Sequence, residues 1–100
     1  MTEGQASIST DILARYAADA AREVDGVRGL VGRRAVRIDD EEGALRVELH
    51  LAVDWGASIP DVGRTVQQRV REYLGNMADA RRTTVDVVVD EVGEPPRTAA

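Results

Sequence analysis

The residue most able to carry acid–base or metal chemistry in this sequence is His50, its one histidine. His50 lies two residues after Glu48 in a stretch that alternates apolar and polar side chains, so both project from the same face of a strand. Asp86 and Asp90 occupy matching positions in a later alternating stretch. A histidine among carboxylates could bind a divalent cation or form an acid–base pair. Because a sheet face is flat and ligand sites are concave, we interpret His50 instead as an exposed residue among alternating charges.

The other groups that could react lack partners at a useful spacing. Ser7, Ser9 and Ser58 have no buried, oriented histidine to activate them, and Ser58 is better placed to cap a helix. The acidic run at 39–42 lacks the spacing of a calcium-binding loop. There is no cysteine, and all 13 basic residues are arginine, which excludes thiolate chemistry and lysine Schiff bases. We therefore expect no catalytic residue, no metal and no cofactor, in a protein that is not an enzyme.

A glycine-rich segment flanked by arginines offers a different chemistry. Gly29 and Gly32 are spaced as in the Gly-x-x-Gly loop with which K-homology domains clamp an RNA backbone, and Arg33 and Arg34 follow. In those domains the loop joins two helices, whereas here it follows a predicted helix and precedes a predicted strand. The formal net charge of −5 also opposes phosphate binding. RNA contact through Gly29, Gly32, Arg33 and Arg34 is kept as the alternative function.

Composition limits the chain to one small domain. Of its 100 residues 43% are hydrophobic, but there is no Phe, one Trp and two Tyr, so the core must be aliphatic. No apolar run approaches the roughly 20 residues that span a bilayer, and residues 1–5 lack the pattern of a signal peptide. We expect a cytoplasmic domain over 8–92, between a flexible leader at 1–7 and a flexible tail at 93–100, without direct membrane insertion.

The start of the domain has the pattern of an amphipathic helix. Polar side chains at 9–11 are suited to the N-cap, and small apolar residues then recur at helical spacing over about 11–24. Gly26 is suited to the left-handed conformation in which helices commonly end. The sequence predicts a glycine-rich connection over 27–33 after this helix.

The rest of the domain predicts two strands, a helix and a third strand. Strands at 34–39 and 45–55 flank a charged hairpin turn, and Ser58 can cap a helix that extends to about residue 77. A last strand covers 84–92. The strand at 45–55 directs six side chains to one side: Leu45, Val47, Leu49, Leu51, Val53 and Trp55. This α-β-β-α-β order predicts an α+β domain, with two helices packed on one face of a three-stranded sheet.

Three segments in the expected order carry a family resemblance. They are AAREVDGV at 20–27 with Leu30; Leu49 with AVDWG at 52–56, SIPDV at 58–62, Val66, Gln67 and Val70; and VDVVVDEV at 85–92. Together they resemble the alkaline-shock protein family of bacterial general-stress and envelope-stress proteins. The resemblance implies a non-catalytic protein that forms homo-oligomers. It also implies a role in tolerating envelope stress at the inner face of the membrane, reached through a membrane-anchored protein of the same family.

The sheet face that no helix covers is the predicted surface for such contacts. Small apolar residues lie there between charges of both signs, a composition that favours partner selection over affinity. A solvated face with no partner would look similar, because interfaces differ little from other surface in bulk polarity. The predicted protein-interaction residues are Arg37, Arg46, Glu48, His50, Ala52, Asp86 and Val88, with Ala35 and Asp90 on the same face.

Overall fold

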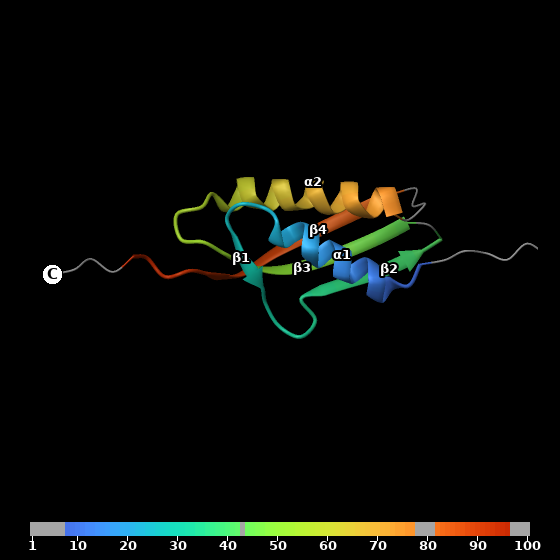
Figure 1. The fold of residues 1–100 in the computed structure, drawn as a ribbon, viewed down its shortest axis with the longest axis horizontal. Helices are drawn as coiled ribbons and strands as arrows, with labels where there is room; N and C mark the ends of the chain where they lie inside the picture. Colours follow the sequence, from blue (N-terminus) through green and yellow to red (C-terminus); the bar gives the residue numbers. More distant parts are fainter. Residues whose placement is uncertain (1–7, 43, 78–81, 97–100) are drawn as a thin grey trace, which may run out of the picture.

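The computed structural model describes residues 8–42, 44–77 and 82–96. It is an α+β domain, as the sequence predicts. Its elements, in chain order, are α1 (Thr10–Arg22), β1 (Val27–Leu30), β2 (Val36–Glu41), β3 (Ala44–Val53), α2 (Ile59–Met77) and β4 (Arg82–Val92) (Figure 1). The predicted leader at 1–7, and the part of the predicted tail beyond residue 96, lie outside the described residues.

Both helices begin at the predicted caps. Ser9 has extended backbone angles, and its Oγ accepts a hydrogen bond from the Ile12 N–H at 3.3 Å. The Ser58 Oγ accepts from the Asp61 N–H at 3.4 Å at the start of α2. Each serine satisfies an amide that the first turn of its helix leaves without a partner.

The sheet is organised around β3, which is the longer strand of the β2–β3 hairpin and pairs with each of the other three strands. β2 pairs antiparallel with the first part of β3, from Glu41 opposite Ala44 to Val36 opposite Leu49. β1 pairs antiparallel with residues 51–53 of β3, while β4 runs parallel to β3 along its whole length. Since a strand has two edges, β1 and β2 share one edge and β4 takes the other. The last strand therefore joins β3 and not β2.

The expectation of three strands was wrong in one respect, because the predicted connection at 27–33 contains β1. This strand has only four residues, it includes Gly29, and its register against β3 shifts between Val27 and Gly29. A short, irregular strand has no two-residue alternation that a sequence pattern could detect. It forms because the end of β3 offers a free edge, which is a property of the folded sheet.

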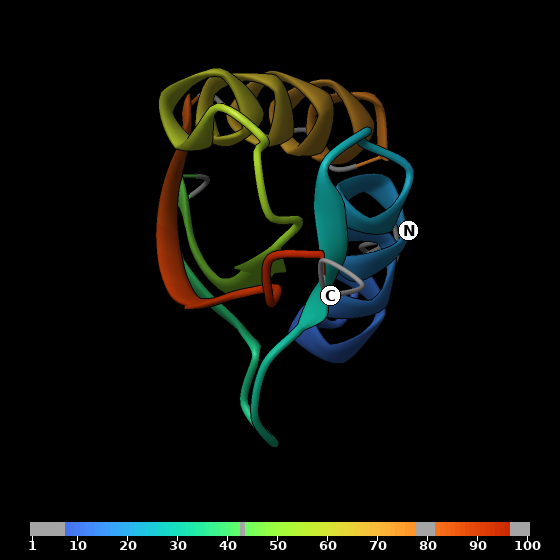
Figure 2. The same cartoon turned by 90° about the vertical axis from the view of Figure 1, so that its left-hand side faces the viewer.

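The core lies between the helices and the inner face of the sheet. Side chains from α1 and the turn after it, α2, β3 and β4 form one buried aliphatic cluster: Leu13, Ala17, Ala20, Ala21, Val24, Leu45, Val47, Leu49, Leu51, Val53, Val62, Val66, Val70, Leu74 and Val85. Viewed end-on, β3 and β4 curve along the left and lower side, with α2 above and α1 to the right (Figure 2). Both helices therefore pack on one face of the sheet, as predicted.

Trp55 does not continue the inward row of β3, contrary to the sequence prediction. β3 ends at Val53, and Trp55 is 57% exposed. The chain turns immediately afterwards: the Ala57 N–H donates to the Asp54 carbonyl at 3.2 Å, and Gly56 has φ of +87°. The sequence prediction extended the alternating pattern of β3 from Val53 to Trp55. These two extra residues belong to a turn, in which side chains do not alternate between two faces.

Candidate functional site

The sheet has an outer face, which is the surface opposite the two helices. Because Leu45, Val47, Leu49 and Leu51 point into the core, the residues between them point outward. The pairing places outward residues of β2 and β4 beside them. The outer face therefore gathers all seven predicted interaction residues: Arg37, Arg46, Glu48, His50, Ala52, Asp86 and Val88.

Four residues at the β2–β3 end of this face form a charge quartet: Arg37, Asp39, Arg46 and Glu48. Across the strands, Arg37 is opposite Glu48 and Asp39 is opposite Arg46. With Asp86 of β4, the quartet lines a hollow of about 210 Å³. Arg46 Nε lies 3.7 Å from Asp86 Oδ2, with both side chains more than half exposed, so this ion pair contributes little to folding stability.

His50 lies between two carboxylates in the middle of the outer face. Its Nδ1 is 2.6 Å from Asp90 Oδ2, and its Nε2 is 2.9 Å from Glu48 Oε2. Hydrogen bonds to Glu48 and then to Asp90 raise the pKa of His50 above its ordinary value of 6.5, against a smaller opposing effect of desolvation. Protonation makes both ring nitrogens donors, so this arrangement favours the imidazolium.

The His50 cluster is arranged as a hydrogen-bond bridge. The two carboxylates approach opposite edges of the ring, so they cannot share a cation with it. Across residues 8–42, 44–77 and 82–96, no group of three or more His, Cys, Asp or Glu side chains could hold a metal ion. The sequence grouped Glu48, Asp86 and Asp90 with His50. In the structure Glu48 and Asp90 contact His50, whereas Asp86 lies beside Arg46.

Small apolar side chains surround His50. Ala35 and Ala52 are each 8% exposed although neither belongs to the core cluster, and Val88 is 38% exposed. Val88 is the β4 partner of His50, and the His50 N–H donates to the Ala35 carbonyl at 2.8 Å. The centre of the outer face is thus partly apolar, and its charged groups lie around that centre.

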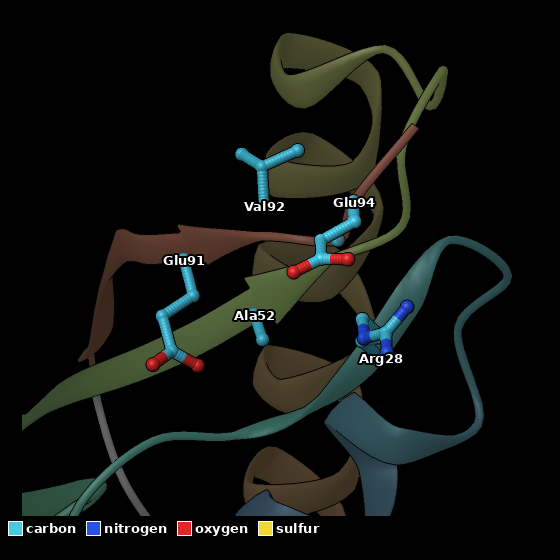
Figure 3. Close-up of a pocket in the computed structure, with 6 residues that line it drawn as sticks. Arg28, Ala52, Glu91, Val92 and Glu94 are labelled. Carbon is cyan, nitrogen blue, oxygen red and sulfur yellow. The ribbon is translucent and has the colours of Figure 1, made fainter. Parts of the chain in front are cut away.

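A second hollow, of about 510 Å³, lies where the outer face meets the end of β3 (Figure 3). Ala52 lies between Glu91 on one side and Arg28 on the other, with Glu94 above them. A Cβ at Gly93 would lie 2.6 Å from Arg28 Nη1, so the guanidinium packs directly against the glycine backbone. The hollow therefore combines one cation and two carboxylates around a small apolar floor.

Sequence reasoning missed Glu91 as a member of this surface. The β3–β4 register shifts between Leu51 and Ala52, so that Ala52 pairs with Glu91 and β4 has one extra residue at Asp90. Such a bulge reverses the parity of every later side chain. The acidic pair Asp90-Glu91 was the only sequence signal, since alternation would place just one of the two on the outer face.

The residues of the RNA alternative are not brought into one loop. Gly29 belongs to β1 and pairs with Ala52, whereas Gly32 has φ of +90° in the connection to β2. Arg33 and Arg34 are exposed in that same connection. The Gly-x-x-Gly spacing therefore spans a strand end and a turn between two strands. RNA contact stays a prediction that this geometry does not test.

The fold and the outer face define a class: a small α+β domain with an aliphatic core and one sheet face left open with mixed charges. A family model described as having a cell envelope-related function, that of the ASP23 (alkaline-shock) family, matches residues 31–93. The chain belongs to this family, which confirms the sequence resemblance. The uncharacterized protein YqhY of Bacillus subtilis (strain 168) is 27% identical over 99 residues, covering 84% of this chain and 73% of YqhY.

Among solved structures, the chain is similar to the MamM CTD. One double-substitution variant has a TM-score of 0.63 at 19% identity, covering 82% of this chain and 93% of that one. A cysteine-to-serine variant has a TM-score of 0.57 at 19% identity, covering 85% and 98%. Other MamM CTD structures are nickel, cadmium and manganese forms. At this identity the similarity establishes the fold alone. Neither described helix of the present chain is long and apolar enough to cross a bilayer.

Proposed function

We propose that this chain is a non-catalytic, self-associating protein of the envelope stress response, which acts through protein–protein contacts near the cytoplasmic face of the membrane. Its family supplies the envelope-related part of this function. One observation carries the rest: the seven predicted interaction residues lie together on a sheet face that neither helix covers. We further propose that a membrane-anchored protein of the same family is one of its partners.

The chemistry of the interior supports contact rather than catalysis. Within the described residues, every buried residue is hydrophobic. Enzyme sites commonly hold buried titratable groups with perturbed pKa values in a concave pocket. In the described part of the chain the two groups whose pKa shifts, His50 and Tyr73, both belong to the surface. Because the described charged side chains all lie at the surface, they are accessible to a binding partner.

The mixed charges of the outer face support a protein as the partner. Arg37 and Arg46 lie among Glu48, Asp86 and Asp90, so carboxylates outnumber arginines in this region. Such a surface does not attract a polyanion. Juxtaposed charges of both signs instead select a partner of complementary pattern.

Sedimentation velocity over a wide concentration range tests the self-association. We expect the wild-type sedimentation coefficient to rise with concentration, and Arg46→Glu to shift that rise to higher concentration. Arg71→Glu is the matched control, because Arg71 is an exposed arginine on α2, which packs on the opposite side of the sheet. A wild-type protein that stays monomeric at the highest attainable concentration would contradict the proposal.

Vesicle flotation tests the membrane partner. We expect the chain to float only with vesicles that contain a membrane-anchored protein of its family. Flotation with bare vesicles of the same lipids would show direct lipid binding and refute the partner-mediated route.

A further inference from the structure

The charge quartet alternates in sign both across the two strands and along each of them. Directly opposite residues of an antiparallel pair lie about 5 Å apart, and same-face residues along a strand lie about 7 Å apart. Arg37 is beside Glu48 across the strands and beside Asp39 along β2. Arg46 is beside Asp39 across the strands and beside Glu48 along β3. Every neighbour in this two-by-two pattern has the opposite sign.

Such a pattern is complementary to a rotated copy of itself. Two identical faces that stack are related by a two-fold axis lying in the plane between them. An axis that crosses the strands at the level of Val47 and Ile38, which are paired, exchanges positions 46 and 48 on β3. It likewise exchanges the two β2 members of the quartet. Each arginine then faces a carboxylate of the other copy.

The remaining strand and the alternative orientations agree with this choice. The same axis passes Val85, the β4 partner of Val47, and places Asp86 opposite the Thr84 hydroxyl of the other copy. An axis along β3 would instead place Arg46 on Arg46 and Glu48 on Glu48, which repel. An axis between β2 and β3 keeps opposite charges together but leaves β4 outside the overlap. The axis that crosses the strands at Val47 is therefore the one for which all three strands meet a suitable partner.

We propose that the charge quartet is a self-recognition element, and that a second copy of this chain stacks on it face to face, with the two β3 strands antiparallel and centred on Val47. This inference rests on the proposed function, since it specifies how the outer face self-associates. Stacked sheets lie about 10 Å apart, a gap that arginine and glutamate side chains can bridge. Exposed charge pairs fix orientation and exclude wrong partners more than they add affinity.

Complementary charge reversal tests the arrangement. Arg46→Glu and Glu48→Arg should each weaken self-association by about tenfold, because each variant places like charges opposite one another twice. An equimolar mixture of the two variants should recover association to near the wild-type level, because position 46 of one then meets position 48 of the other with opposite signs, and vice versa. Sedimentation equilibrium of the separate and mixed variants measures this recovery.

A second mixture controls for orientation. Arg46→Glu mixed with Asp39→Arg should not recover, because in the proposed stack position 46 does not meet position 39. Arg46 is 74% exposed at its side chain, so we expect the variants to fold, and their circular dichroism spectra check this.

The outcomes separate the two proposals. A monomeric wild type refutes self-association altogether, and this inference with it. A wild type that associates, with variants whose first mixture fails to recover, refutes the quartet stack and leaves the proposed function standing. Recovery in the second mixture instead of the first assigns the axis between β2 and β3 and refutes the antiparallel stack centred on Val47. Recovery in the first mixture alone supports the proposal.

Discussion

Gly26 lies between α1 and β1 and packs against the start of α2, so replacing it with alanine should be among the most damaging single-methyl changes in the chain. Its φ is +94°, and an added Cβ would lie 2.7 Å from Val62 Cγ2 and 3.3 Å from Ala57 Cβ. Val62 is buried, so its side chain has little room to move. The Gly26 carbonyl accepts from the Asp54 N–H at 2.8 Å, which holds the backbone in place. An alanine at position 26 could therefore change neither its backbone angles nor its position freely.

The expected magnitude follows from three contributions. A left-handed alanine costs about 1–2 kcal/mol, and overpacking in a filled site costs about 1–3 kcal/mol. The less flexible unfolded chain of an alanine variant offsets about 0.4–1 kcal/mol of this. Gly26→Ala should therefore lower the free energy of unfolding by about 3 kcal/mol, within a combined range of about 1–5 kcal/mol, which is a large share of the 5–15 kcal/mol typical of a domain.

Two other glycines separate these contributions. Gly32 has φ of +90°, but a Cβ there would meet nothing within 4 Å, so Gly32→Ala isolates the backbone cost. We expect it to destabilise by about 1 kcal/mol. A Cβ at Gly63, inside α2, would also meet open space. Because glycine is a poor helix former, Gly63→Ala should stabilise by about 0.5–1 kcal/mol.

Urea unfolding followed by far-ultraviolet circular dichroism measures all three variants on one scale. In a domain of this size about 1 kcal/mol corresponds to a shift of roughly 4–8 °C in Tm, so thermal unfolding gives an independent check. If Gly26→Ala proves no more destabilising than Gly32→Ala, the close approach of Gly26 to Val62 has no energetic weight, and the reasoning fails.

Two further predictions concern the surface groups whose pKa is shifted. NMR titration should give His50 a pKa above 6.5, which Asp90→Asn lowers. Because the folded-state pKa is the higher one, the stability that Asp90 adds is complete below about pH 6.5 and is lost as pH rises through the folded value, so equal losses at pH 6 and pH 9 would contradict the bridge. The Tyr73 hydroxyl donates to Glu23 at 2.5 Å, which raises the pKa of Tyr73 above 10. Ultraviolet titration should show that Glu23→Gln lowers it, while an unchanged curve would mean that no such hydrogen bond forms.

The outer face could be predicted largely because β3 alternates over its whole length. A two-residue period maintained through ten residues determines both faces at once, so Arg46, Glu48 and His50 were assigned together. The capping serines were equally local, since a cap depends on residues within one turn of it. Family membership was also within reach, because its motifs are contiguous pieces of sequence.

The parts that sequence reasoning missed depend on contacts between distant segments. β1 needs the exposed edge of β3, the β4 bulge that turns Glu91 outward needs the β3 register, and Arg28 needs Gly93 to pack against. The charge quartet belongs to the same group. The sequence shows its four charged residues individually, but their two-by-two arrangement follows from the β2–β3 register. Each of these features is a relation between strands, and no single window of sequence contains it.

The break between β1 and β2 has a consequence for how this fold can accept new sequence. The Val31 N–H donates to the His50 carbonyl at 2.9 Å, and the Ala35 carbonyl accepts from the His50 N–H at 2.8 Å. The chain thus leaves the sheet and returns to it at the same rung, with residues 32–34 protruding between (Figure 1). Strands on either side are registered independently against β3. Extra residues grafted into this protrusion would lengthen it without moving the ladder, which makes it the natural place to insert an epitope or a fluorescent label close to the stacking surface.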